Sequence, residues 1–219
     1  MSAVSFDGET SSGLMRRAVF LDKDGTLLDS VPYNADPLRV TLARGARGAL
    51  GALKAHGFLL VVVSNQPGVA LGYFALQAMA PVERRIQELL APGGARIDAF
   101  YYCPHLPQGA NVRYAVRCLC RKPQPGLLRK AARDWQIDLT HSWLIGDVLD
   151  DIEAGNRASC QTMLVHTGNE TEWRLGLHRQ PQHVAHSLRQ AARQILMPAG
   201  RAPRDPGGDG DAFDVASQA

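Results

Sequence analysis

The chain has 219 residues, of which 45% are hydrophobic and 21% charged, and its formal net charge is +3. This composition is typical of a globular protein, and the length is sufficient for one domain with a substantial core. The small net charge, without a basic stripe interleaved with aromatic residues, argues against nucleic acid as a partner. The longest apolar run, residues 58–63, is too short to cross a bilayer, so no membrane association is expected.

The two ends of the chain differ in composition from its middle. Residues 1–16 are small and polar, carry Asp7 and Glu9 and have no apolar signal core, so we expect a flexible arm and a cytoplasmic protein. Residues 198–219 are rich in proline, glycine and aspartate, which predicts a disordered tail. Residues 17–197 are left as one folded domain, which we expect to be monomeric.

Strand and helix patterns alternate along this domain. Continuous apolar runs predict strands, and apolar residues at helical spacing predict helices. Their alternation is typical of a doubly wound α/β fold, a mainly parallel sheet with helices on both faces, and no large cap domain is expected. The segments 30–37 and 103–120 lack a regular pattern. The predicted strands are 18–21, 58–63, 99–102, 142–145 and 162–165, and the predicted helices are 45–56, 79–90, 125–135, 151–157 and 184–196.

Two aspartates, Asp22 and Asp24, follow the first predicted strand and precede a Gly-Thr turn. An open α/β sheet binds its ligands just beyond the carboxyl ends of its strands. Two carboxylates are costly there unless a cation or a reaction needs them. One could attack phosphorus while the other moves protons, and together they could hold Mg²⁺. The alternative is an Asx-type turn that only caps the strand.

Three further polar residues follow later elements in the same way. Taken singly, Ser64 could cap a strand end, Lys122 could be a surface lysine, and Asp147 could start a helix. Taken together in this order, they supply a hydroxyl that clamps phosphate, a cation for phosphoryl charge and a carboxylate for a metal. With Asp22 and Asp24 they make up a complete phosphoryl-transfer site.

Three of the four cysteines lie within residues 103–120, which in a cytosolic chain favours a metal over a disulfide. The set formed by Cys103, His105, Cys118 and Cys120 offers three thiolates and one imidazole, which suits tetrahedral Zn²⁺. Because four protein ligands leave no position for water, we expect a structural zinc that stabilises the loop. The alternative is a few buried thiols beside a surface histidine.

These motifs, in this order, resemble the haloacid dehalogenase (HAD) superfamily of aspartate-nucleophile phosphatases over about residues 17–170. A closer resemblance is to the D-glycero-D-manno-heptose 1,7-bisphosphate 7-phosphatases. The histidinol-phosphate phosphatases share the motifs and the zinc loop, but their loop is usually shorter than the interval from His105 to Cys118. The stretches that carry the closer resemblance are FLDKDGT (20–26), SNQ (64–66), YYCPH (101–105) and CLCRKP (118–123).

The resemblance implies Mg²⁺-dependent removal of the C7 phosphate from a small phosphosugar. Asp22 would attack phosphorus and form an aspartyl-phosphate, and Asp24 would act as general acid and then general base. Mg²⁺ would be held by Asp22, the backbone carbonyl of Asp24, and Asp147. Ser64 and Lys122 would hold the phosphoryl oxygens.

The resemblance also assigns residues around the reacting atoms. Arg121 is expected to recognise substrate, and Asp151 to orient the metal ligands or the active-site lysine. The chain departs from the family at Val148, where the family usually has lysine. Lys23 or Arg121 could supply the missing positive charge. Alternatively, this enzyme could prefer a different phosphosugar. The sugar-contacting positions are expected to be Ser30, Val31, Pro32, Tyr33, Asn65, Gln66 and Pro67.

Two other functions stay open at this point. The chain could be a histidinol-phosphate phosphatase or act on another sugar phosphate. It could also be a zinc-stabilised binding module with a vestigial site. The presence of all five residues of the phosphoryl-transfer set argues against the vestigial reading.

Overall fold

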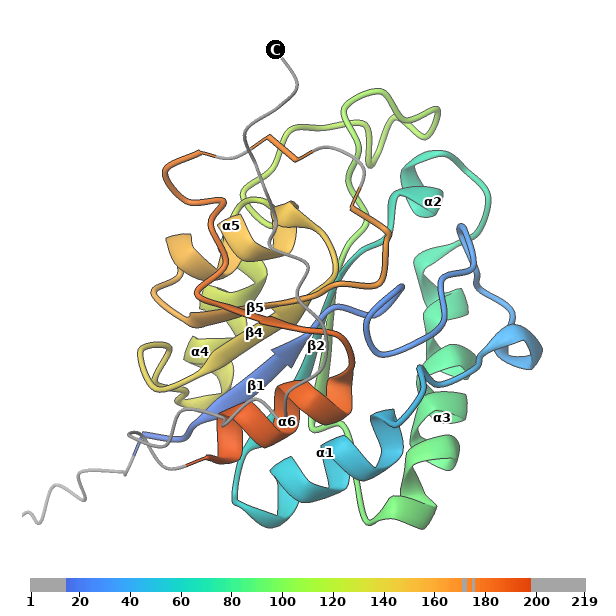
Figure 1. Ribbon diagram of the computed structural model, residues 1–219. Coiled ribbons are helices and arrows are strands. Elements are labelled where there is room, and N and C mark those ends of the chain that lie inside the picture. Colours follow the sequence, from blue (N-terminus) through green and yellow to red (C-terminus); the bar gives the residue numbers. More distant parts are fainter. Residues whose placement is uncertain (1–14, 171–172, 175, 198–219) are drawn as a thin grey trace, which may run out of the picture.

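A parallel sheet of six strands forms the centre of the protein (Figure 1). The structure, a computed structural model, describes residues 15–170, 173–174 and 176–197. The strand order is β3-β2-β1-β4-β5-β6, and every neighbouring pair is parallel. The strands are β1 (Ala18–Leu21), β2 (Leu59–Asn65), β3 (Ala99–Cys103), β4 (Trp143–Gly146), β5 (Gln161–Val165) and β6 (His183–Ala185).

β1 is buried on both faces, as its uninterrupted apolar sequence predicts. All four of its residues are fully buried. Because successive strand side chains point to opposite faces, Val19 and Leu21 enter one core cluster while Ala18 and Phe20 enter the other. The strand thus joins the two halves of the core.

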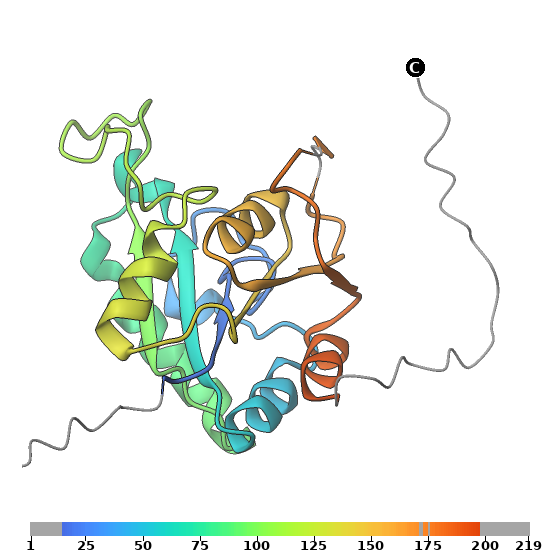
Figure 2. The same cartoon turned by 90° about the vertical axis from the view of Figure 1, so that its left-hand side faces the viewer.

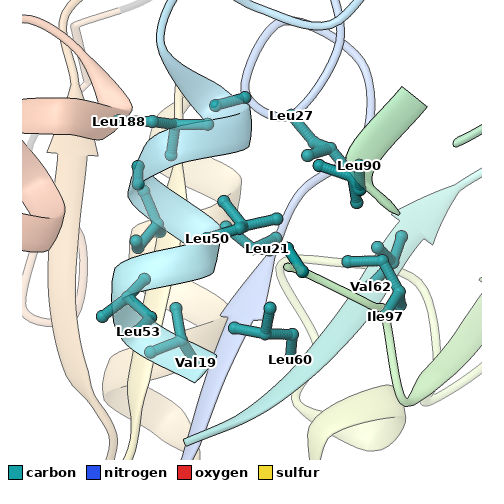
Figure 3. Close-up of a cluster of buried hydrophobic side chains, with 14 of the residues drawn as sticks. Val19, Leu21, Leu27, Leu50, Leu53, Leu60, Val62, Leu90, Ile97 and Leu188 are labelled. Carbon is teal, nitrogen blue, oxygen red and sulfur yellow. The ribbon is translucent and has the colours of Figure 1, made fainter. Parts of the chain in front are cut away.

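Helices cover both faces of the sheet (Figures 1 and 2). On one face α1, α3 and α6 share a core cluster with Val19 and Leu21, and Figure 3 shows Leu50 of α1 beside Leu21. On the other face α4 and the end of α5 pack around Phe20. The helices are α1 (Ala46–Ala55), α2 (Pro67–Ala70), α3 (Met79–Leu90), α4 (Gly126–Trp135), α5 (Leu149–Arg157) and α6 (Leu188–Leu196), with 3-10 turns η1 (Pro37–Arg39), η2 (Leu76–Ala78) and η3 (Ala91–Gly93).

The predicted doubly wound α/β fold is therefore confirmed. The five predicted strands all form, and no segment within the described ranges builds a separate cap domain. Of the expected arm at 1–16, only the last two residues are described, and Arg16 pairs there with Ile137. The expected tail at 198–219 lies outside the described residues. None of the described helices is long and apolar enough to span a membrane.

The predicted helix 184–196 is wrong at its start. Val184 and Ala185 belong to the edge strand β6, where Val184 is exposed and Ala185 is buried. The helix begins after Ser187, whose hydroxyl accepts the backbone N–H of Gln190, an N-cap that ends the strand-to-helix connection.

Smaller differences lie at other helix starts, and α5 begins at Leu149, two residues before the predicted start at 151. Pro125 is the N-cap of α4 rather than a first-turn residue. The segment expected to lack regular structure ends in the 3-10 turn η1, because Asp36 accepts the N–H of Leu38 and Pro37 has the fixed φ that suits a first helical position.

Candidate active site

Asp22 follows β1 directly, in the middle of the sheet. Its backbone N–H donates to the carbonyl of Ile145 in β4 at 3.0 Å, which continues the sheet ladder to this residue. The residue is buried, and its Oδ1 pairs with the ammonium of Lys122. The strand order therefore brings together two residues a hundred positions apart in the sequence.

Lys122 is a buried cation held by three oxygens. Its Nζ pairs with Asp22, lies 2.6 Å from Oδ1 of Asp151, and donates to the carbonyl of Val63 at 3.0 Å. Burial alone would lower its pKa, but the charges of Asp151 and Asp22 raise the pKa above that of an ordinary lysine. Lys122 is therefore not a solvated surface lysine, while its contact with phosphoryl oxygens stays a prediction.

The backbone of Lys122 is held by Asn65 at the end of β2. The side-chain amide of Asn65 donates to the carbonyl of Lys122 and accepts its N–H, both at 3.0 Å. This double contact joins β2 to the loop that carries the lysine. Sugar contact by Asn65, which the family resemblance implies, stays a prediction.

Asp147 follows β4 and is held by two donors. Its Oδ1 accepts the hydroxyl of Thr26 at 2.9 Å, and its Oδ2 accepts the amide of Asn169 at 2.7 Å. Burial and the charge of Asp22 raise its pKa to about 6. Gly25 passes so close that a Cβ there would lie 2.1 Å from Oδ2 of Asp147, and its φ of +90° also favours glycine.

Sequence reasoning missed Asn169, which lies beyond the carboxyl end of β5. The available signal was a polar side chain after another strand of the same parallel sheet.

Three buried carboxylates gather at this edge of the sheet. Asp22, Asp147 and Asp151 each place an oxygen within 4.8 Å of the others. Burial raises the pKa of Asp151 to about 7, although the charge of Lys122 opposes this shift. One lysine cannot balance three carboxylates, and closely spaced hard oxygen donors are what Mg²⁺ binds. The residues present therefore fit a divalent cation.

Asp24 lies at the same edge but does not join this carboxylate group. Its Oδ1 is 2.6 Å from the ammonium of Lys23, and its Oδ2 accepts the side-chain amide of Gln66 at 3.1 Å. The same amide nitrogen donates to the hydroxyl of Ser64 at 2.9 Å. The burial of Lys23 was not predicted, because a lysine in an acidic loop after a strand is expected to lie at the surface.

The phosphoryl-transfer residues line one open pocket of about 190 Å³. Of the sugar-contacting candidates, Asn65 lines this pocket, whereas Ser30 lines a second hollow of about 290 Å³. Arg121 donates to the carbonyl of His105 at 3.3 Å. The pocket is lined by Asp22, Asp24, Ser64, Asn65, Lys122, Asp147, Val148, Asp150 and Asp151.

The predicted zinc ligands also converge. Cys103, His105, Cys118 and Cys120 place their ligand atoms within 4.8 Å of one another. The sulfur of Cys120 lies 3.3 Å from the sulfurs of Cys103 and Cys118 and 3.3 Å from Nδ1 of His105. Sulfurs bound tetrahedrally to zinc at about 2.3 Å lie about 3.8 Å apart. The cysteines are free, so the cluster fits a metal ion of the zinc type.

Curated relatives match this chain over most of its length. The D-glycero-beta-D-manno-heptose-1,7-bisphosphate 7-phosphatase of Pasteurella multocida (strain Pm70) is 40% identical over 155 residues, 70% of this chain and 84% of its own length. The chain belongs to this family. The enzyme of the same name from Photorhabdus laumondii is 40% identical over 152 residues, 69% of this chain and 81% of its own.

Members of the heptose bisphosphate phosphatase family also match in structure. The D,D-heptose 1,7-bisphosphate phosphatase from B. bronchiseptica, solved with magnesium and phosphate, is 30% identical with a TM-score of 0.72 and covers 82% of this chain and 98% of its own. The family model described as HAD-hydrolase-like matches residues 119–191. That range contains Lys122, Asp147 and Asp151. The predicted membership of the heptose branch of the HAD superfamily is confirmed, and the chain is a phosphatase of this hydrolase class.

Proposed function

We propose that this protein removes the C7 phosphate of D-glycero-D-manno-heptose 1,7-bisphosphate with the help of Mg²⁺. The observation that carries the proposal is the buried pair of Asp22 and Lys122 beside two further carboxylates, in a chain 40% identical to enzymes named for this reaction. A buried nucleophile, a buried cation and a set of carboxylate ligands are the parts that phosphoryl transfer needs.

In the proposed reaction Asp22 attacks the phosphorus and the bond from phosphorus to the sugar oxygen breaks. Asp24 gives a proton to the leaving oxygen and later takes one from the attacking water. Lys122 and Ser64 hold phosphoryl oxygens. Asp22, Asp147 and the backbone carbonyl of Asp24 would hold Mg²⁺, which would supply the positive charge that lets an anionic nucleophile approach an anionic phosphate.

Asp151 has a positioning role in this scheme. It pairs with Lys122 at 2.6 Å and lies in the first turn of α5, fully buried. The N–H of Val148 donates to its other oxygen at 3.4 Å. Asp151 thereby fixes the direction of the lysine side chain toward the phosphoryl group, in agreement with the role expected from the family.

The zinc site is proposed as structural, because its four protein ligands would fill the coordination of Zn²⁺ and leave no position for water. Arg121, which follows the last of these ligands and donates to the carbonyl of His105, is proposed to recognise the substrate. The strip from Ser30 to Tyr33 and the loop from Asn65 to Pro67 are proposed to contact the sugar. We further propose a cytoplasmic monomer.

The test is phosphate release from the heptose bisphosphate, with the position of the lost phosphate read by ³¹P NMR. Histidinol phosphate and a panel of sugar monophosphates are assayed beside it. Asp22→Asn should abolish turnover with the fold intact, because an amide is not a nucleophile. Faster release from histidinol phosphate would contradict the proposed substrate. Absence of release from every ester would indicate a vestigial site.

A further inference from the structure

Lys23 is a buried lysine that lies between the two active-site aspartates in the sequence. It is 1% exposed and is among the largest fully buried side chains of the described chain. Its ammonium lies 2.6 Å from Oδ1 of Asp24. An ammonium taken out of water costs free energy unless a partner compensates it. The fold therefore holds this cation against Asp24.

The carboxylate of Asp24 is thereby held at both oxygens. Lys23 takes Oδ1, and the amide of Gln66 donates to Oδ2 at 3.1 Å. Gln66 is itself buried and is fixed by its second contact with Ser64. The last torsion of a free aspartate is broad and roughly two-fold, so two fixed donors select one orientation of the carboxylate. The Asp24 side chain remains 32% exposed and lines the pocket.

We propose that Lys23 is a positioning residue, which fixes the Asp24 carboxyl in the orientation from which it gives its proton to the leaving oxygen. This inference rests on the proposed function. As the bond from Asp22 to phosphorus forms and the bond from phosphorus to the leaving oxygen breaks, the O–H bond of Asp24 breaks and its proton passes to that oxygen. Lys23 donates no proton itself and does not touch substrate.

A positioning role predicts dependence on the leaving group. A sugar alkoxide is a strong base and leaves only with a proton, whereas 4-nitrophenolate is a weak base and leaves without one. General acid catalysis contributes about 10²–10⁴-fold, so losing its alignment affects the sugar ester alone. A residue that only supports the fold would affect both esters equally.

The experiment measures kcat/KM of the full-length enzyme with Mg²⁺ for the heptose bisphosphate and for 4-nitrophenyl phosphate. Lys23→Met should lower the value about 10–100-fold for the sugar ester and less than about threefold for the aryl ester. Because kcat/KM reports formation of the aspartyl-phosphate, the later base step does not enter the comparison.

Two controls separate positioning from folding. In an Asp24→Asn background, Lys23→Met should cause no further loss on the sugar ester. Lys54→Met, which removes the 2.6 Å ion pair with Asp98 on another part of the molecule, should leave the ratio of the two esters unchanged.

Equal losses on both esters, or a further loss in the Asp24→Asn background, would overturn the inference and leave the proposed function intact. If the wild type hydrolyses neither ester, the proposed function fails, and the inference fails with it. If another sugar phosphate is the better substrate, the same ratio is measured with that sugar.

Discussion

Individual residues in this site act through partners that are distant in the sequence. Asn65 holds the backbone of Lys122, and Thr26 holds the carboxylate of Asp147. The residue types and their places after predicted strands indicated phosphoryl transfer. The pairings depend on which strands become neighbours, and no local pattern specifies that order.

Gly25 shows how little room the site leaves. Gly25→Ala should place a methyl group 2.1 Å from Oδ2 of Asp147 and displace that carboxylate, so kcat/KM should fall by about a hundredfold. The matched control is Gly57→Ala, because Gly57 also has a positive φ of +81° but has nothing within 4 Å of the added methyl. It should lose about 1–2 kcal/mol of stability and keep its activity. An active Gly25→Ala enzyme would contradict the crowding argument.

Val148 tests the departure from the family pattern. Val148 lines the pocket directly after Asp147, whereas Lys23 is buried against Asp24 and Arg121 donates to a backbone carbonyl. Val148→Lys should therefore raise kcat/KM for the heptose bisphosphate. A charge-assisted hydrogen bond of about 1.5–3 kcal/mol corresponds to roughly 10–100-fold.

The control for this substitution is Val148→Met, which adds length without charge and should leave kcat/KM unchanged. An unchanged or lower value for Val148→Lys would show that the missing lysine does not limit this enzyme.

At the scale of elements, the zinc loop is the segment whose own sequence supplies least structure. The zinc loop and the residues directly after it, 104–125, contain no helix or strand, yet this segment carries Arg121 and Lys122. The fold of this segment was not predictable from periodicity. The four metal-type ligands were predictable, because residue identity and clustering carry that signal.

Purified protein should contain about one zinc per chain, as the four-ligand set implies. Cys118→Ser should lose the metal and loosen the loop, so trypsin should cleave faster after the exposed Arg113 and Arg117 before the carboxylate cluster is affected. Cys160→Ser makes the same change at a buried cysteine outside the cluster and should keep its zinc. Elemental analysis measures the metal, and a zinc-free wild type purified without chelator would contradict the assignment.

Edge strand β6 explains why the predicted helix 184–196 is wrong at its start. Its three residues are too few to establish an alternating pattern, and the apolar residues of α6 follow closely enough to extend a helical pattern backward. Pairing with β5 overrides that local preference, because it satisfies backbone groups that a helix start would leave open.

At the scale of the whole molecule, β1 is the strand from which the sheet grows in both directions, so the switch point of the strand order lies beside it. β2 and β3 lie on one side of it, and β4, β5 and β6 on the other. The alternation of elements predicted a parallel sheet with its chemistry at one edge. The strand order was not predicted, because it follows from how the crossover helices pack on the sheet.

A consequence for the whole molecule is that its stability should depend on Mg²⁺. Three buried carboxylates share one lysine, so a bound cation should favour the folded chain. At a hundred times the dissociation constant this linkage is worth about 2.7 kcal/mol, or roughly 5–10 °C in the melting temperature of a domain this size. Asp147→Asn removes one ligand and part of the repulsion.

Without Mg²⁺, Asp147→Asn should therefore melt no lower than wild type. When Mg²⁺ is added, the melting temperature of this variant should not rise. Asp98→Asn, remote from the cluster and paired with Lys54, should keep the rise. Scanning calorimetry with and without Mg²⁺ measures all three proteins. Only binding to the folded site links the metal to unfolding. If the melting temperature of the wild type does not rise, or rises equally in Asp147→Asn, these carboxylates do not hold the cation.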